Sequence, residues 1–165
     1  MFARVRRLQS HLVHVLLATD AQWVVDDLVA ALGGPETSFT VCRNGRDVTD
    51  VVKARTPDLA ILDLQSGSMG GIAVTMNLRL DESSGALPRV PVLILLDRTA
   101  DIFLAKRSGA DAWLVKPLDA LSIQRAVHGV LHPPQPAAAA EAVVDAAVEV
   151  ETDAESAEEE VVSAG

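Results

Sequence analysis

The chain of 165 residues has a single cysteine, Cys42, and no apolar run of membrane-spanning length. A lone cysteine excludes an intrachain disulfide and a cysteine-based zinc site, and it favours a reducing, cytoplasmic setting. The apolar stretch after the three arginines near the N-terminus is short and contains His14. It therefore fits a strand better than a signal peptide, and we expect no contact with a membrane.

Basic residues are missing from the C-terminal part. Residues 132–165 contain nine acids and no Lys or Arg, whereas residues 1–131 contain 14 acidic and 14 basic residues. The whole net charge of −9 therefore belongs to the tail, and the neutral remainder gives no electrostatic basis for direct nucleic-acid binding. The sequence also lacks a glycine-rich nucleotide loop and the residue pattern of a hydrolase triad, and its histidines show no metal-site spacing. We do not expect an enzyme.

The composition divides the chain into three parts. We predict an N-terminal extension of residues 1–11, a domain of residues 12–131, and a tail of residues 132–165. The tail starts with closely spaced prolines and continues almost entirely with Ala, Val, Glu, Asp, Ser and Thr. Because this composition cannot bury enough apolar surface, we expect the tail to be disordered. We also expect that it forms no DNA-binding output domain.

Short apolar runs alternate with helical patterns along the domain. Strands are predicted at residues 14–19, 38–43, 58–63, 90–96 and 112–116. Helices are predicted between and after them, marked by Val24, Leu28 and Leu32, by Val48, Val51 and Val52, by Ile72, Met76 and Leu80, by residues 98–108, and by a last helix that Asp119 caps. Residues 81–89 are predicted to form a loop. Five such units predict an α/β fold, a doubly wound parallel sheet with helices on both faces.

Polar residues stand where the predicted strands end. In an open parallel sheet, sites form at the carboxyl ends of the strands, so we expect Asp20, Asp63 and Lys116 to meet at one edge. Two neighbouring carboxylates repel each other unless a cation joins them, and Mg²⁺ prefers carboxylates, carbonyl oxygens and water. Each residue also has a plainer interpretation, since Asp20 could cap the next helix and Lys116 could be a solvated lysine. Trp23 and Trp113 are expected to be packing residues and not residues that stack on a ligand.

The stretches "PDLAILDLQSGSMGG", "PVLILL" and "GADAWLVKPLDA", at their spacing along the chain, resemble the receiver domain of two-component response regulators. The resemblance covers roughly residues 12–131 and implies a flavodoxin-like, five-stranded sheet of order 2-1-3-4-5. It implies that Asp63 is the phosphoacceptor, that Asp20, Asp63 and the Gln65 carbonyl bind Mg²⁺, and that Lys116 contacts the phosphoryl group. Pro117 would follow a cis peptide bond.

Two residues depart from the pattern of this family. Thr19 stands where the first acid of an acidic pair is expected, which weakens the Mg²⁺ site. Leu96 stands at the switch position of a Ser or Thr whose hydroxyl bonds a phosphoryl oxygen, and leucine cannot make that bond. Trp113 occupies the aromatic switch position. Asp97 would bring further negative charge to the phosphate if it pointed inward.

These observations favour a single-domain response regulator that takes a phosphoryl group from a histidine kinase or phosphotransfer protein and signals through an unidentified output protein. The expected contact surface is built by the fourth helix, fifth strand and fifth helix, includes Ile102, Phe103, Lys106 and Trp113, and could also form a homodimer. The alternative is a pseudo-receiver that acts without phosphorylation as an interaction module. A flavodoxin-like small-molecule binder is less favoured, because the loop after the first strand has no glycines to hold a phosphate.

The predicted tail can be tested by deletion. If residues 132–165 are disordered, a chain without them should keep the melting temperature of the full chain, because no packed surface is lost. Thermal unfolding followed by circular dichroism measures this. A large drop in melting temperature would show instead that the tail packs on the domain.

Overall fold

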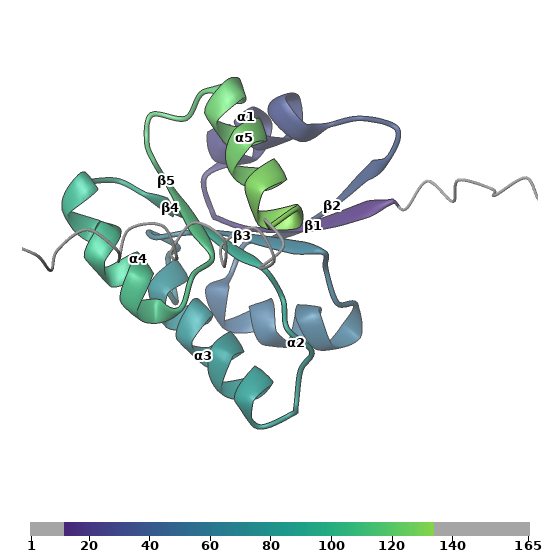
Figure 1. Ribbon diagram of the computed structural model, residues 1–165, viewed down its shortest axis with the longest axis vertical. Helices are drawn as coiled ribbons and strands as arrows, with labels where there is room; N and C mark the ends of the chain where they lie inside the picture. The colour runs from purple at the N-terminus through teal and green to yellow at the C-terminus, as the bar shows by residue number, and fades with distance from the viewer. Residues whose placement is uncertain (1–11, 134–165) are drawn as a thin grey trace, which may run out of the picture. The chain divides into compact units, whose positions relative to one another are not determined.

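The computed structural model describes residues 12–133, so the predicted N-terminal extension and nearly all of the predicted tail lie outside the described residues. The domain contains one sheet of five parallel strands in the order β2-β1-β3-β4-β5, which confirms the predicted topology (Figure 1). The strands are β1 (Val13–Ala18), β2 (Thr37–Cys42), β3 (Leu59–Asp63), β4 (Val92–Leu96) and β5 (Ala112–Val115). The helices are α1 (Gln22–Leu32), α2 (Val48–Ala54), α3 (Gly71–Ser83), α4 (Ile102–Ser108) and α5 (Ala120–Leu131).

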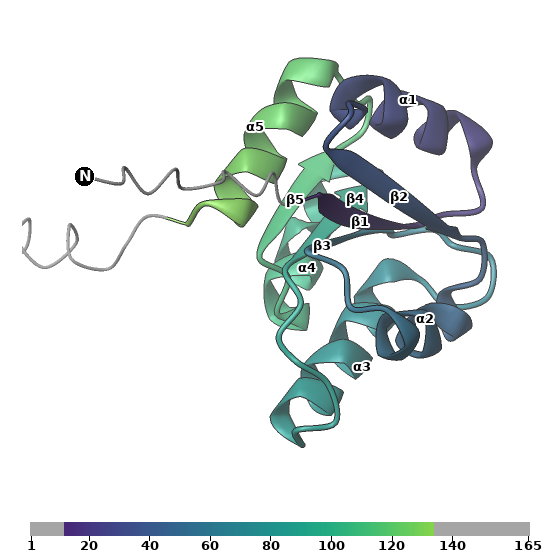
Figure 2. The ribbon, with the colours of Figure 1, turned by 90° about the vertical axis from the view of Figure 1, so that its right-hand side faces the viewer.

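Helices cover both faces of the sheet. In two views at right angles, α1 and α5 lie on one side and α2, α3 and α4 on the other (Figures 1 and 2). Two short 3₁₀ turns, η1 (Gly45–Asp47) and η2 (Thr99–Asp101), lead into α2 and α4. None of the helices within residues 12–133 is long and apolar enough to cross a membrane.

Alternation along the strands produces two separate cores. Because successive side chains of a strand point to opposite faces, a strand that is buried on both faces must be apolar throughout. Under α1 and α5 the strands contribute Val15, Leu17, Leu59, Ile61, Leu93 and Leu95. Under α2, α3 and α4 they contribute Leu16, Ala18, Ala60, Leu62, Val92, Ile94 and Leu96.

The strand register aligns the carboxyl ends of the central strands. Ala18 pairs with Leu62, Asp63 pairs with Leu95, and Leu96 pairs with Val115. The residues that follow, at positions 19, 97 and 116, therefore emerge beside Asp63 at a single edge. The register thus places the polar residues that end these strands next to one another.

Helix α3 differs from its prediction in length and in the face that it buries. It extends to Ser83, into the stretch predicted as a loop, because Glu82 pairs with Arg79 and accepts a hydrogen bond from the Val90 amide. Its buried residues are Gly71, Val74, Thr75 and Leu78, whereas Met76 and Leu80, which mark the helix in the sequence, are exposed. Polar residues of this helix thus serve long-range contacts that a local pattern does not reveal.

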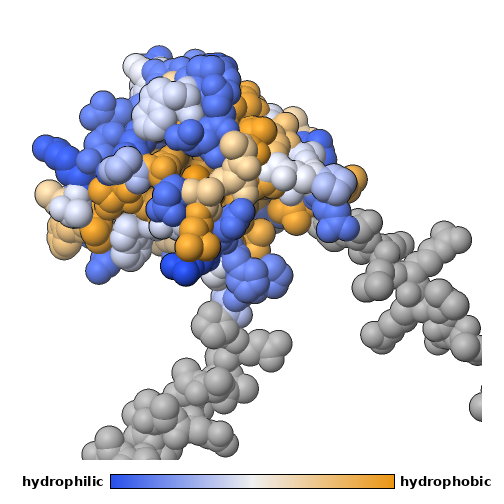
Figure 3. Space-filling model, turned by 90° about the horizontal axis from the view of Figure 1, so that it is seen from above, coloured by the Kyte–Doolittle hydropathy of each residue, from blue (hydrophilic) through white to orange (hydrophobic). Residues whose placement is uncertain are grey.

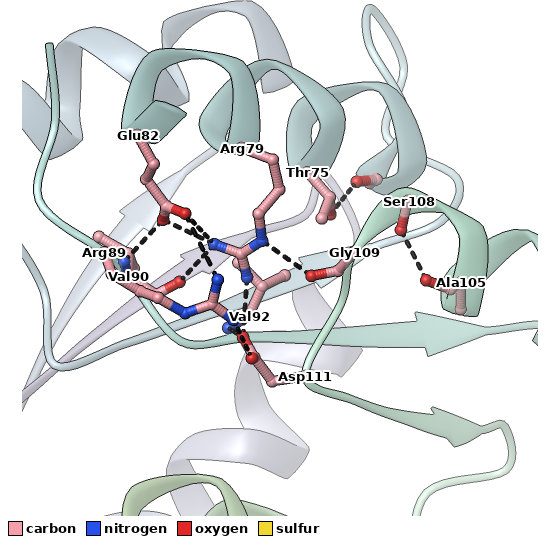
Figure 4. Close-up of polar contacts among 11 residues, drawn as sticks. Thr75, Arg79, Glu82, Arg89, Val90, Val92, Ala105, Ser108, Gly109 and Asp111 are labelled. Atoms are coloured by element: carbon pink, nitrogen blue, oxygen red, sulfur yellow. Dashed lines mark hydrogen bonds and ion pairs between the residues drawn. The ribbon is translucent and has the colours of Figure 1, made fainter. Parts of the chain in front are cut away.

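Charged residues tie the end of α3 to the starts of β4 and β5 (Figure 4). The Arg79 guanidinium donates to Glu82 at 2.6 Å, to Asp111 at 2.8 Å and to the Gly109 carbonyl at 2.8 Å. Asp111 also accepts from the Val92 amide at 2.8 Å, which joins it to the first residue of β4. Gly109 ends α4 with a φ of 84°, a conformation that strongly favours glycine. The edge of the sheet opposite Asp63 is therefore fixed by a connected set of ion pairs.

The contribution of these ion pairs is testable. We expect Asp111→Ala to lower the free energy of unfolding by about 2–3 kcal/mol, because it leaves the Val92 amide without a partner and removes one of the two carboxylates that pair with Arg79. Arg89→Ala is the control, since Arg89 also pairs with Asp111 but its side chain is 62% exposed. Arg89→Ala should lower the free energy of unfolding by less than about 1 kcal/mol. Urea unfolding measures both, and equal losses would contradict the assignment.

Candidate functional site

Asp63 ends β3 as a nearly buried carboxylate, with only 2% of its surface exposed. Such a group is costly to remove from water unless it is paired and hydrogen-bonded. Its Oδ2 accepts from the Thr19 hydroxyl at 2.9 Å, and its Oδ1 accepts from the Lys116 ammonium at 2.8 Å and from the Gln65 amide at 3.3 Å. The apolar strand that ends in an acid thus holds that acid in a fixed position, hydrogen-bonded and paired with an ammonium.

The two residues that follow β1, Thr19 and Asp20, have different hydrogen-bond partners at this edge of the sheet. Thr19 is buried, and its hydroxyl donates to Asp63 while accepting from the Ala21 amide at 3.2 Å. Asp20 is exposed and accepts from the Gly67 amide at 3.1 Å. It does not cap α1, whose N-cap is Ala21 without a side-chain bond. Asp20 therefore faces the loop after β3, and its plainer interpretation as a helix cap is wrong.

Tight packing brings that loop back over the end of β3. A Cβ on Gly70 would lie 2.5 Å from the Leu64 carbonyl oxygen, and one on Gly71 would lie 2.8 Å from that of Asp63. Both distances are shorter than a carbon atom tolerates, so only glycine lets α3 begin this close to the strand. The glycines of the loop thus set the position of Gly67 and Gln65 beside the carboxylates.

Lys116 joins two carboxylates at this edge. Its ammonium contacts Asp63 at 2.8 Å and Asp97 Oδ1 at 3.1 Å, and only 13% of its side chain is exposed. It also lies 5.5 Å from the centre of the Trp23 ring. Asp97 therefore does point inward, and Lys116 is a partly buried counter-ion and not a solvated lysine.

The two carboxylates govern the protonation of Lys116. Burial on its own lowers the pKa of the ammonium, but hydrogen bonds to Asp63 and Asp97, together with their charges, outweigh it and raise the pKa above the ordinary 10.5. Lys116 is therefore fully protonated at neutral pH and carries the positive charge that an anion at this site requires.

The switch positions lie in the core behind the site. Leu96 is fully buried, and Trp113 packs partly buried against the same cluster under α3 and α4, which confirms packing for Trp113. The Lys106 ammonium lies 5.3 Å from the Trp113 ring. Trp23 is 52% exposed, and its ring packs beside Lys116. The peptide bond between Lys116 and Pro117 is cis.

The donor set suits a magnesium ion in part. Asp20 and Asp63 supply two carboxylates, and the Gln65 carbonyl accepts no hydrogen bond from any residue in the described range 12–133. Mg²⁺ is commonly held by one or two carboxylates with water and phosphate oxygens. No group of three or more His, Cys, Asp or Glu residues able to hold a metal occurs within that range. The residues therefore fit an ion that completes its shell with water or a phosphoryl oxygen.

Sequence reasoning underestimated two residues of this site. Asp97 was expected to matter only if it pointed inward, and nothing in the local pattern gives its direction. Trp23 was expected only to pack, although a position in the first turn of α1, beside the edge where the strands end, was a signal for the site. Both contacts reach Lys116 from distant parts of the chain.

The raised pKa of Lys116 predicts how stability depends on pH. Because the folded pKa exceeds the unfolded one, the stability from these contacts is complete below the unfolded pKa and is lost as pH rises through the folded pKa. The difference in free energy of unfolding between the wild type and Lys116→Met should therefore be constant from about pH 7 to 9 and shrink above about pH 10.5. Chemical unfolding at each pH measures it. Lys53→Met, at an exposed residue of α2, should show no such change, and a Lys116 difference that stays flat at high pH would contradict the assignment.

Comparison with known proteins agrees with this geometry. The family model of the response regulator receiver domain matches residues 15–128. Protein PilH of Pseudomonas aeruginosa is 25% identical over 120 residues, which cover 73% of this chain and 98% of PilH. The transcriptional regulatory protein CseB of Streptomyces avermitilis is 28% identical, over 72% of this chain but only 48% of CseB.

A solved structure shares the fold. It is the receiver domain of the sensor histidine kinase PA1611 of Pseudomonas aeruginosa, with magnesium coordinated in its active-site cleft. Its TM-score is 0.60 at 21% identity, over 72% of this chain and 96% of that one. With the sheet order, the aligned strand ends and the match over residues 15–128, this chain belongs to the receiver domains of two-component response regulators.

Proposed function

We propose that this receiver domain accepts a phosphoryl group on Asp63 from a histidine kinase or phosphotransfer protein. The observation that carries the proposal is the Asp63 carboxylate, 2% exposed at the carboxyl edge of the sheet, with the Lys116 ammonium at 2.8 Å. Receiver domains are signalling modules and not typical enzymes, so the covalent step serves to pass on a signal. We place this exchange in the cytoplasm, which the single cysteine also favours.

The proposed step is a displacement at phosphorus. An Asp63 carboxylate oxygen forms the new bond to phosphorus while the phosphorus–nitrogen bond of the donor phosphohistidine breaks, and its electron pair stays on the imidazole nitrogen. An anionic nucleophile and an anionic phosphoryl group repel each other, so the reaction needs positive charge at the site. Lys116 supplies part of it, and the hydrogen bond from Thr19 holds Asp63 in place.

Magnesium would supply the remaining charge. Asp20, Asp63 and the Gln65 carbonyl are the residues that would hold it, as the partial fit of the donor set suggests, and the related receiver domain of PA1611 contains such an ion. When bound, Mg²⁺ neutralises charge between carboxylate and phosphoryl oxygens. Thr19 provides a hydroxyl where a carboxylate would strengthen the site, so we expect weak magnesium affinity.

A second candidate is the pseudo-receiver, which works without phosphorylation. Two observations favour it. The Thr19 hydroxyl already occupies Asp63 Oδ2, and Leu96 is fully buried in the core with no group that could bond a phosphoryl oxygen. The pairing of Asp63 with Lys116 favours phosphoacceptance over this alternative, because the ammonium also places positive charge where an incoming phosphoryl group requires it.

Output would pass through protein–protein contacts. Phe103 and Leu104 of α4 and Leu121 of α5 are exposed hydrophobic residues, and Ile102 and Trp113 are partly buried near them. Hydrophobic residues also gather at the surface in the view down onto the α1 and α5 side (Figure 3). We propose the α4–β5–α5 surface for the output partner or for a homodimer. Substitutions there that leave all partners unaffected would count against this.

The decisive experiment is intact mass spectrometry after incubation with Mg²⁺ and acetyl phosphate. We expect one phosphoryl group on the wild type and none on Asp63→Asn, because the amide cannot act as the nucleophile. Absence of labelling in both, with no spectral response to beryllofluoride, would favour the pseudo-receiver. Labelling of both proteins would place the phosphoryl group on another residue.

A further inference from the structure

The Lys116 ammonium has three hydrogen-bond donors, and its surroundings already engage it from three elements. Asp63 at the end of β3 and Asp97 after β4 accept hydrogen bonds at 2.8 and 3.1 Å, and the Trp23 ring of α1 lies at 5.5 Å. A phosphoryl oxygen on Asp63 would need a donor from the same ammonium. The phosphoryl group would therefore compete with the present contacts for Lys116.

Asp97 is the contact that can yield. Asp63 is held by Thr19 and Gln65 as well as by Lys116, whereas the Asp97 carboxylate has Lys116 as its only hydrogen-bond partner within the described residues. Its Oδ2 is buried without a partner, yet 32% of the side chain is exposed, so water lies within reach of a rotated carboxylate. A carboxylate with one oxygen unpaired gains hydration when it leaves.

We propose that Asp97 is a charge-operated latch, which holds Lys116 in the unphosphorylated protein and is expelled by the phosphoryl group on Asp63. This inference rests on the proposed phosphoacceptance. The phosphoryl oxygens compete with Asp97 for Lys116 and also repel its carboxylate. Leu96 has no group that could bond a phosphoryl oxygen and so draw the loop after β4 toward it. Here the loop moves instead because the ion pair between Asp97 and Lys116 is lost.

The loop that carries Asp97 leads directly into α4. Arg98 pairs with the buried Asp101 at 3.2 Å, so residues 98–101 form a local unit. This unit leads directly into Ile102, the first residue of α4. Release of Asp97 therefore displaces the N-terminal end of α4, where Phe103 and Leu104 are exposed. A change of charge at Lys116 thus reaches the surface that we propose for output.

The chain's two tryptophans allow binding and movement to be measured separately. With Trp113→Phe, the fluorescence of Trp23 beside Lys116 reports binding at the site. With Trp23→Phe, the fluorescence of Trp113 reports the α4 side. Beryllofluoride with Mg²⁺ is the probe, because it binds an aspartyl carboxylate as a phosphoryl mimic and needs no donor or leaving group. Each measurement uses the full chain with Asp97, Asp97→Asn, Asp97→Ala or Asp97→Glu.

We expect Asp97→Asn and Asp97→Ala to bind beryllofluoride roughly tenfold more tightly than the parent protein, because the competing charge is gone. Their Trp113 emission without ligand should already resemble that of the beryllofluoride-bound parent. Asp97→Glu should keep the parent's weaker binding. Asp50→Asn, which removes one exposed charge from α2, should change neither readout.

The outcomes separate the latch from the proposed function. If acetyl phosphate labels the wild type but Asp97→Asn neither binds more tightly nor shifts Trp113, the latch is overturned and phosphoacceptance stands. If only Asp97→Asn binds beryllofluoride and becomes labelled, the latch is supported and phosphoacceptance by the natural chain fails. If no variant binds beryllofluoride, both are overturned, since nothing then displaces Asp97.

Discussion

One ammonium holds the carboxyl edge of this sheet together. Lys116 is the cation that contacts both Asp63 and Asp97, and these acids end or follow the central strands β3 and β4. A carboxylate as buried as Asp63 would be strongly destabilising without such a partner, because its hydration is lost and must be replaced. The aligned strands bring the acids together, and Lys116 supplies the opposite charge that stabilises that arrangement.

The two departures from the family pattern affect the site differently. Thr19 remains part of it, since its hydroxyl donates to Asp63 and stabilises the ionised carboxylate without adding charge. Leu96 lies outside the site, because its side chain is in the core with Val92 and Ile94. The carboxylate that we propose as the nucleophile is thus supported, while the proposed link from a phosphoryl group to the β4–α4 loop must come from another residue. Asp97, one position further on, is the residue that contacts Lys116 there.

The sequence predicted the fold and the main acids well, because both depend on local patterns. Apolar runs that alternate with helical spacing identify parallel strands, and an acid directly after such a run, as at Asp63, stands out. Contacts between distant segments were beyond this reasoning. The direction of Asp97, the exposure of Trp23 and the extension of α3 to Ser83 all depend on partners 8 to 93 residues away. Local hydrophobicity carries no information about such partners.

Helix α4 is held differently at its two ends, and this directs any motion that starts at Asp97. At its C-terminal end, Arg79 binds the Gly109 carbonyl and Asp111, which anchors the turn into β5 (Figure 4). At its N-terminal end, the preceding loop reaches the site through the Asp97 contact with Lys116. A rigid attachment at one end and an exchangeable ion pair near the other favour a tilt of α4 over a translation. A small change of charge beside Asp63 would therefore displace α4 most near Phe103, at the N-terminal end of the helix.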